Sequence, residues 1–292
     1  NWTTAPRAVW RHEDAIGFLV GEGTSADKTL TNSGSVAADT TDPREGVKSA
    51  AFNSTLRTVQ YLYCPDATCG GTTELDFNGS TNISFGGWVK VTSNPKSLTL
   101  FHKWLSNLGY RIQTQQQSRP QCGINGAPAA VFPSSAPLQQ SVWAFVACTA
   151  DGANIRGYKN VGAAPVITTA STARPSDSAN AFALNNVTAA TDWSGNWDEA
   201  FVDDIAYGIQ TLCRICSLGF TGARGECHAT DYALPGLASY KGCGTNADCN
   251  SGAGICNTTD GRCTGYRQSV LGRPNCLGCV LPACNQAAPG TN

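Results

Sequence analysis

The chain has 292 residues, with 20 Lys and Arg against 21 Asp and Glu, so its formal net charge is −1. This balance argues against a nucleic-acid partner or a polybasic membrane-surface module, because both need a basic stripe. No segment approaches the roughly 18–20 consecutive apolar residues of a membrane helix, so we expect no membrane insertion. Hydrophobic residues make up 41% of the sequence, which is enough to build a folded core.

The first two thirds of the chain carry short apolar segments that are typical of β-strands. Helical periodicity is nearly absent, apart from one short turn expected within residues 208–215. Residues 142–149 are apolar on both faces, as in a strand that is covered on both sides, and Asp151-Gly152 follows as a turn signal. Many short strands separated by Gly, Asn, Ser and Pro predict an all-β, two-sheet antiparallel sandwich. The expected strands are 83–91, 97–101, 110–114, 142–149, 155–159 and 200–207.

Fourteen cysteines divide the chain into two parts, with four before residue 213 and ten after residue 212. An even number, dense at one end, predicts a disulfide framework made in an oxidising compartment. We therefore predict a β-sandwich domain over residues 1–212 and a small disulfide-rich domain over residues 213–292. The cysteines expected in disulfides are Cys64, Cys69, Cys122, Cys148, Cys213, Cys216, Cys227, Cys243, Cys249, Cys256, Cys263, Cys276, Cys279 and Cys284.

The state of the tail cysteines decides between a secreted protein with disulfides and a zinc-binding protein. The sequence contains no Met and opens at Asn1, so we expect an extracellular or cell-surface protein whose secretory signal has been removed. Zinc is the alternative, because Cys213-Arg-Ile-Cys216 and Cys276-Leu-Gly-Cys279 each have the spacing of half a thiolate site. The many surrounding cysteines and the glycosylation sequon at Asn257 favour disulfides.

Five segments resemble, in the same order, the laminin-G-like and concanavalin A-like jelly rolls. The resemblance spans roughly residues 9–212 and implies a jelly-roll sandwich. It leaves activity open, since this fold hosts lectins, matrix modules and hydrolases. The five segments are Ala50-Ala-Phe-Asn53, Leu75-Asp-Phe-Asn-Gly-Ser80 with the strand that follows, Leu100-Phe-His-Lys-Trp104 with Gly109-Tyr-Arg-Ile112, Val142-Trp-Ala-Phe-Val-Ala-Cys-Thr-Ala-Asp-Gly152, and Phe201-Val-Asp-Asp-Ile-Ala-Tyr-Gly208.

The jelly-roll resemblance implies one possible cofactor, and the tail resembles a second kind of module. Such jelly rolls often hold a structural calcium ion, and no other cofactor is expected. Asp203 and Asp204 alternate across a strand, so only one of them could face a calcium site, and the sequence defines no full ligand set. In the tail, Cys243 to Cys249, followed by Cys256 and Cys263, loosely resembles an EGF-like module. Short loops between these cysteines suit a segment stapled by disulfides rather than one with a large core.

Asparagine sequons predict N-linked glycosylation of a secreted protein. In a chain this rich in Asn, Ser and Thr, each sequon can instead be a turn-forming Asn. The sequons begin at Asn1, Asn53, Asn78, Asn82, Asn186 and Asn257.

The residues give little support for catalysis. Glu74-Leu-Asp-Phe-Asn78 resembles the paired-carboxylate strand of jelly-roll glucanases, but Asn78 or Gly79 stands where the second acid should be, and an amide cannot protonate a leaving group. The three histidines, His12, His102 and His228, lie apart and belong to no nucleophile–base motif. We expect His102 to be a sheet residue with its hydrogen bonds made, and we expect no enzyme.

Two functions remain after these exclusions. The first is a secreted, glycosylated structural or adhesive protein, a subunit of an extracellular filament, matrix or cell-surface assembly that binds other copies or other glycoproteins. The alternative is a glycan-binding lectin that uses the rim of the jelly roll, with Trp193 and Trp197 as a stacking platform. The same two tryptophans could instead cover the end of the sandwich, because large aromatic side chains mostly serve packing.

Overall fold

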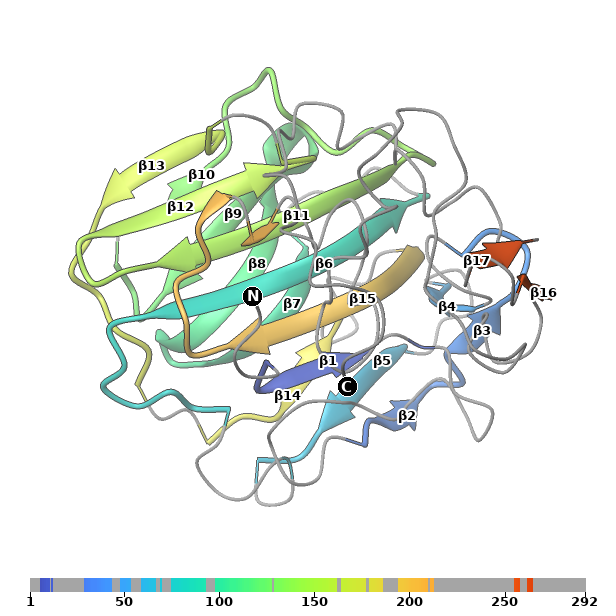
Figure 1. Ribbon diagram of the computed structural model, residues 1–292. Helices are drawn as coiled ribbons and strands as arrows, with labels where there is room; N and C mark the ends of the chain where they lie inside the picture. Colours follow the sequence, from blue (N-terminus) through green and yellow to red (C-terminus); the bar gives the residue numbers. More distant parts are fainter. Residues whose placement is uncertain are drawn as a thin grey trace.

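The protein folds as two antiparallel β-sheets packed face to face (Figure 1). The computed structural model describes residues 6–10, 12, 29–43, 48–53, 59–66, 69, 75–92, 98–127, 129–161, 164–176, 179–185, 194–209, 211–212, 255–257 and 262–264. Within these residues, no helix is long and apolar enough to cross a bilayer. The expectation of an all-β jelly-roll sandwich is confirmed.

One sheet has eight strands in the order β13-β12-β11-β6-β15-β4-β3, with β1 paired to β15. Every residue of β6, β11 and β15 is buried, because apolar side chains cover this sheet on both faces. Trp88, Phe145 and Phe201 form the outer layer together with Tyr207 and Leu212. The strands are β1 (Ala8–Trp10), β3 (Ala37–Asp39), β4 (Ser49–Phe52), β6 (Ile83–Val91), β11 (Trp143–Ala150), β12 (Asn154–Lys159), β13 (Ile167–Ala170) and β15 (Gly195–Asp203).

The other sheet has seven strands in the order β10-β9-β8-β7-β14-β5-β2. Burial alternates along β5 and β8, so one face of this sheet meets the core while the other is partly exposed. Strands β7 and β8 form a hairpin whose turn residues, Ser106 and Asn107, both have positive φ. The strands are β2 (Thr31–Ser33), β5 (Tyr61–Cys64), β7 (Thr99–Leu105), β8 (Leu108–Gln115), β9 (Arg119–Ile124), β10 (Ala130–Val131) and β14 (Phe182–Leu184), and the 3-10 helix η2 (Gln116–Ser118) joins β8 to β9.

The core between the sheets is rich in aromatic side chains. Trp10 of β1 stacks on Phe182 of β14, with ring centroids 4.3 Å apart, and so joins the two sheets. Phe101 of β7 also joins the two sheets, because its ring stacks on Phe85 of β6 and makes a tilted contact with Trp197 of β15. Each fully buried side chain of this size stabilises the fold by roughly 1.5–3 kcal/mol relative to its exposed state.

Two disulfides lie in the sandwich. Cys122 of β9 bonds to Cys148 of β11, so it joins the two sheets covalently, while Cys64 and Cys69 close a short loop after β5. The prediction of disulfides at these four cysteines is confirmed. In the tail, β16 (Ile255–Asn257) pairs with β17 (Arg262–Thr264) and brings Cys256 opposite Cys263 in the register. The other eight predicted cysteines lie outside the described residues, and the domain boundary at residue 212 stays a prediction.

The last strand of the sandwich differs from the one expected at 200–207. Strand β15 runs from Gly195 to Asp203, and the chain leaves the sheet after Asp203. A bulge between Asp198 and Phe201 shifts the register and hides the alternation from sequence inspection. The short turn expected nearby is present, since the amides of Thr211 and Leu212 donate to the carbonyl of Gly208.

Candidate functional site

The outer face of the seven-stranded sheet carries a set of aromatic, amide and basic side chains, which we name the aromatic–amide face. Alternation along β8 turns Tyr110, Ile112 and Thr114 towards the core, and turns the residues between them outwards. Neighbouring strands add further outward positions on the same face. The members are Tyr61, Tyr63, His102, Trp104, Arg111, Gln113, Gln115, Arg119 and Gln121.

The register aligns large and small residues in one row across this face. Tyr63 pairs with Ala183, Ala183 with His102, His102 with Arg111, and Arg111 with Gly123. Because directly paired residues on one face lie about 4.5–5.5 Å apart at Cβ, these side chains are neighbours across the row. Large side chains therefore stand beside positions that have little or no side chain.

Arg111 lies against the ring of Trp104, and its guanidinium carbon is 4.2 Å from the ring centroid. Gly123 makes this arrangement possible, because a Cβ there would lie 3.2 Å from Cγ and 3.3 Å from Nε of Arg111. Burial lowers the pKa of Arg111 from its ordinary value, although an arginine side chain remains charged in proteins. Nε of Arg111 has no hydrogen-bond partner, and the guanidinium has no ion pair among the described residues.

His102 lies beside Arg111 and is only 4% exposed. Burial lowers its pKa to about 4; the nearby charge of Arg111 adds to this shift, and a hydrogen bond with the Asn185 backbone opposes it. His102 is therefore neutral at physiological pH. Within the described part of the chain its Nε2 has no hydrogen-bond partner, so the expectation that all its hydrogen bonds are made is wrong at this atom.

Glutamine amides and tyrosine rings extend the face on either side of Arg111 and His102. The Nε2 group of Gln113 donates to Oε1 of Gln121 at 2.9 Å, and Gln115 donates to the same oxygen. Tyr61 and Tyr63 lie side by side on β5, with ring centroids 5.2 Å apart. The face thus offers flat rings for stacking together with polar groups that can bind hydroxyls.

The charge on this face has one sign. Within the described residues of the seven strands, the outward positions include Arg111 and Arg119 but no Asp or Glu. Among the described residues, Asp66 and Asp76 lie at the ion-paired cluster around Lys103 and not at these outward positions. The aromatic–amide face is therefore positive over a broad pH range, because its two arginines stay charged. His102 is neutral above about pH 4 and adds no charge.

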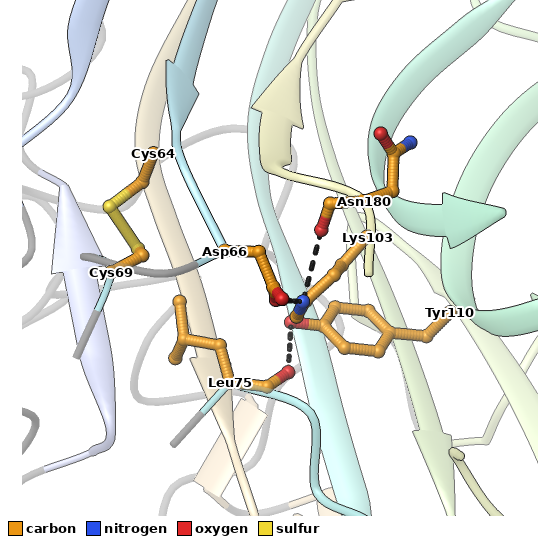
Figure 2. The surroundings of a disulfide bond; sticks show 7 residues. All are labelled: Cys64, Asp66, Cys69, Leu75, Lys103, Tyr110 and Asn180. Carbon is orange, nitrogen blue, oxygen red and sulfur yellow. Dashed lines mark hydrogen bonds and ion pairs between the residues drawn. A yellow bond between two sulfur atoms is a disulfide. The ribbon is translucent and has the colours of Figure 1, made fainter. Parts of the chain in front are cut away.

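The Lys103 cluster lies beside the Cys64–Cys69 disulfide (Figure 2). Nζ of Lys103 is 2.8 Å from the carboxylate of Asp76, and both side chains are almost completely buried. The same ammonium donates to Asp66 and to the carbonyl of Asn180. The charges of Lys103 and Asp76 are thus buried and paired with each other.

The two candidates for calcium binding are also engaged in structural contacts. Asp203 accepts hydrogen bonds from the Tyr207 hydroxyl at 2.6 Å and from the Arg7 amide at 3.2 Å, while Asp204 forms an ion pair with the Arg7 guanidinium. Burial raises the pKa of Asp203 to about 6, and Asp204 contributes to the same shift. Among the described residues, no group of three His, Cys, Asp or Glu is placed to hold a metal ion.

The structure places Trp197 in the core and not on an exposed platform. Trp197 is fully buried between the sheets, and its indole N–H donates to the carbonyl of Leu100 at 3.0 Å. The hypothesis that Trp197 stacks on a sugar is wrong, because the outward-facing positions of β15 belong to its neighbours. Trp193 lies outside the described residues, as does Glu74 of the carboxylate pair.

The sequons fall into two groups. Asn53, Asn78 and Asn82 are exposed, which is compatible with glycan attachment and leaves that prediction open. Asn1 and Asn186 lie outside the described residues, and only the backbone of Asn257 is described, in β16. His12 is buried beside β1, whereas His228 and the CxxC cysteines proposed as zinc ligands fall outside the described part.

Sequence inspection missed the aromatic–amide face, although a signal was present. Residues 61–64 read Tyr-Leu-Tyr-Cys and residues 110–115 read Tyr-Arg-Ile-Gln-Thr-Gln, and both alternate between core-forming and outward side chains. What inspection lacked was the strand order. Only the strand order places β14 between β5 and β7, and so brings the tyrosines of β5 to the same face as Arg111.

Comparisons with known proteins agree on the fold. The model of the concanavalin A-like lectin/glucanases superfamily matches residues 60–206. The receptor-binding domain of botulinum neurotoxin C/D mosaic serotype aligns with a TM-score of 0.52 at 12% identity, over 70% of this chain and 49% of that one. The binding domain of paraclostridial mosquitocidal protein 1 aligns with a TM-score of 0.50 at 11% identity, over 65% of this chain and 47% of that one. This chain thus spans about half of each toxin fragment.

A third structure aligns over most of its own length. It is domain 4 of AbnA, an extracellular arabinanase from Geobacillus stearothermophilus solved with arabinotriose, with a TM-score of 0.49 and 16% identity, over 71% of this chain and 96% of that one. A search of curated proteins finds no match to the sequence of this chain.

Proposed function

Because the chain belongs to the concanavalin A-like lectin and glucanase superfamily, we propose that it is an extracellular glycan-binding protein that uses its aromatic–amide face. The observation that carries this proposal is the set of partly exposed rings beside partly exposed polar side chains on one sheet face. Sugars present apolar C–H faces and hydroxyl edges, so they stack on rings and bind amide and guanidinium groups. Trp104, Tyr61 and Tyr63 offer the rings, while Arg111 and Gln113 offer the polar groups.

The contrast between the two sheets favours this face over the opposite one. The eight-stranded sheet buries Trp88, Phe145 and Phe201 under a second apolar layer. Those rings are therefore buried in packing contacts, whereas Trp104 and the two tyrosines of β5 remain partly exposed. The binding site then lies on the sheet rather than on the rim near residue 193, which is where the sequence placed the lectin alternative.

We propose that the domain binds glycans without cleaving them. A glycosidase of the usual kind needs two carboxyl groups on either side of the scissile bond. Asp76 is 2% exposed and paired with Lys103, which supports a structural role for that carboxylate. The outward positions of the described seven-stranded sheet carry no acidic side chain that could act as acid or nucleophile.

An extracellular location is part of the proposal. The disulfides Cys64–Cys69 and Cys122–Cys148 support it, because such bonds persist mainly in oxidising compartments. An adhesive role is compatible with glycan binding, since a lectin domain can attach a matrix or surface protein to its neighbours. Assembly into a filament stays a prediction, and sedimentation of the full chain over a concentration series tests it, because a constant monomer mass would contradict it.

A glycan array tests the binding proposal. Wild-type protein should bind a defined set of glycans, and Trp104→Ala should abolish most of that signal. Thr168→Ala is the matched control, because Thr168 is exposed on β13 of the other sheet. Thermal unfolding establishes that each variant is folded. Binding that survives Trp104→Ala unchanged would contradict the proposed site.

A further inference from the structure

We propose that the aromatic–amide face selects acidic glycans, and that Arg111 binds their carboxylate or sulfate group. This inference rests on the proposed function and adds the class of ligand. It begins from the charge of the face, on which the described outward positions carry two arginines and no acidic residue. The whole chain has a formal net charge of −1, so this face is positive although the protein is not.

Arg111 is the cation best placed to bind an anion. Its guanidinium is held against Trp104, and the absent side chain of Gly123 leaves room for this position. A guanidinium fixed in place loses less conformational freedom when it binds, which increases the affinity gained from each hydrogen bond. Its planar fork also matches the two oxygens of a carboxylate or a sulfate.

The missing counter-charge is the second observation. A half-buried arginine is ordinarily paired with a carboxylate, as Arg156 is paired with Asp151 on the other sheet at 2.7 Å. Arg111 has no such partner among the described residues, and its Nε forms no hydrogen bond. Burial lowers its pKa, which means that the charged form is held there at a cost. An incoming anion would remove this cost.

His102 lies beside Arg111 but adds no charge to the site. The hydrogen bond between its ring and the Asn185 backbone, together with an Nε2 that has no hydrogen-bond partner among the described residues, places the proton of the neutral ring on Nδ1. His102 is a register neighbour of Arg111 but is only 4% exposed, so the contact with an anion is made by the guanidinium of Arg111 and not by this imidazole.

Titration calorimetry with three probes tests the inference. The probes are tetragalacturonate, which carries carboxylates, a heparin tetrasaccharide, which carries sulfates as well, and galactotetraose, which is neutral. At least one acidic probe should bind ten-fold or more tightly than galactotetraose, and its affinity should fall as sodium chloride is raised from 50 to 500 mM. Tetragalacturonate against the heparin fragment distinguishes the two kinds of anion.

Charge-matched variants locate the effect. Arg111→Gln should weaken the acidic probe by 10-fold or more and should weaken it several-fold more than the neutral probe, a difference typical of a lost charge-assisted contact. Arg156→Gln removes the same charge from the other sheet and should change neither affinity. Arg111→Lys should restore part of the acidic affinity, since it keeps the charge but not the fork.

The outcomes separate this inference from the proposed function. Equal or tighter binding of galactotetraose, lost with Trp104→Ala, would overturn the acidic selectivity and leave the glycan-binding face standing. Acidic binding that Arg111→Gln and Arg156→Gln weaken equally would also overturn it, because the effect would then come from net charge. Binding of none of the three probes, with an empty glycan array, would overturn both.

Discussion

Cys122 of β9 and Cys148 of β11 are bonded to each other across the interface between the two sheets. Each cysteine is fully buried and lies in the same core as the aromatic stacks. The bond spans 26 positions in sequence, whereas the bond between Cys64 and Cys69 spans five. The first therefore restricts the unfolded chain more than the second.

Replacing both Cys122 and Cys148 with Ala should lower the free energy of unfolding by about 2–4 kcal/mol, because the unfolded chain gains freedom. The paired change at Cys64 and Cys69 should cost less, since its loop is shorter. Urea unfolding followed by tryptophan fluorescence measures both. Equal losses in the two double variants would contradict the assignment of the larger role to the bond between sheets.

The pKa of His102 gives a prediction for stability in acid. Burial holds this pKa at about 4 in the folded state, below the ordinary value of 6.5. As the pH falls from 6.5 to 4, the unfolded chain binds the proton first, so the free energy of unfolding decreases. His102→Gln removes this proton uptake, and the wild type should lose up to about 3 kcal/mol more than the variant over that range.

Chemical denaturation at pH 7, 5.5 and 4.5 measures the difference. If the wild type and His102→Gln lose stability in parallel, His102 does not have the lowered pKa. The proton uptake of the wild type on unfolding, measured by calorimetry in buffers of different ionisation enthalpy, provides an independent check.

Asp203 should change the free energy of unfolding with pH in the direction opposite to His102. Burial raises its pKa to about 6, with a contribution from Asp204, so the folded state keeps this proton at a pH where the unfolded chain has lost it. The stability associated with the protonated carboxyl is therefore present at low pH and is lost as the pH rises from about 4 through 6. Asp203→Asn should lack this one contribution, so the stability of the wild type relative to the variant should fall as the pH rises from about 4 to 6. A difference between the two that stays constant over this range would contradict the assignment.

Gly123 offers a test of how Arg111 is positioned. Gly123→Ala places a methyl group 3.2 Å from Cγ of Arg111, so the Arg111 side chain must shift by a few tenths of an ångström relative to Trp104. Affinity for the acidic probe should fall several-fold while the variant remains folded. Gly208→Ala is the control, because a Cβ at Gly208 would meet nothing within 4 Å. Equal affinities for both variants would show that Arg111 does not need its place beside Trp104.

The fold was largely predictable from the sequence, and the reason lies in patterning. Residues 142–149 are apolar throughout because β11 is covered on both faces, and the Asp151-Gly152 turn is present with a positive φ at Gly152. The limits of β15 were wrong because the bulge after Asp198 interrupts alternation. The alternation of apolar and polar residues indicates which face of a strand each side chain lies on. It does not indicate a register shift between two paired strands.

The candidate site was less predictable, because it depends on strand order. Trp197 stands among small polar residues in the sequence, which suggested an exposed platform, yet its ring fills the core. His102 and Arg111 lie nine positions apart and meet through the β7–β8 register, while Tyr63 reaches the same row through β14. Cross-strand neighbours of this kind become visible only once the sheet is known.

The most direct test of the glycan-binding face uses nuclear magnetic resonance to monitor a titration of isotope-labelled protein with a glycan selected on the array. We predict that the indole N–H signal of Trp104 and the side-chain amide signals of Gln113 and Gln121 will shift with one common dissociation constant. The indole signal of Trp197 and the backbone signals of β13 should stay in place. Shifts confined to the eight-stranded sheet or to the loops around residue 193 would contradict the account.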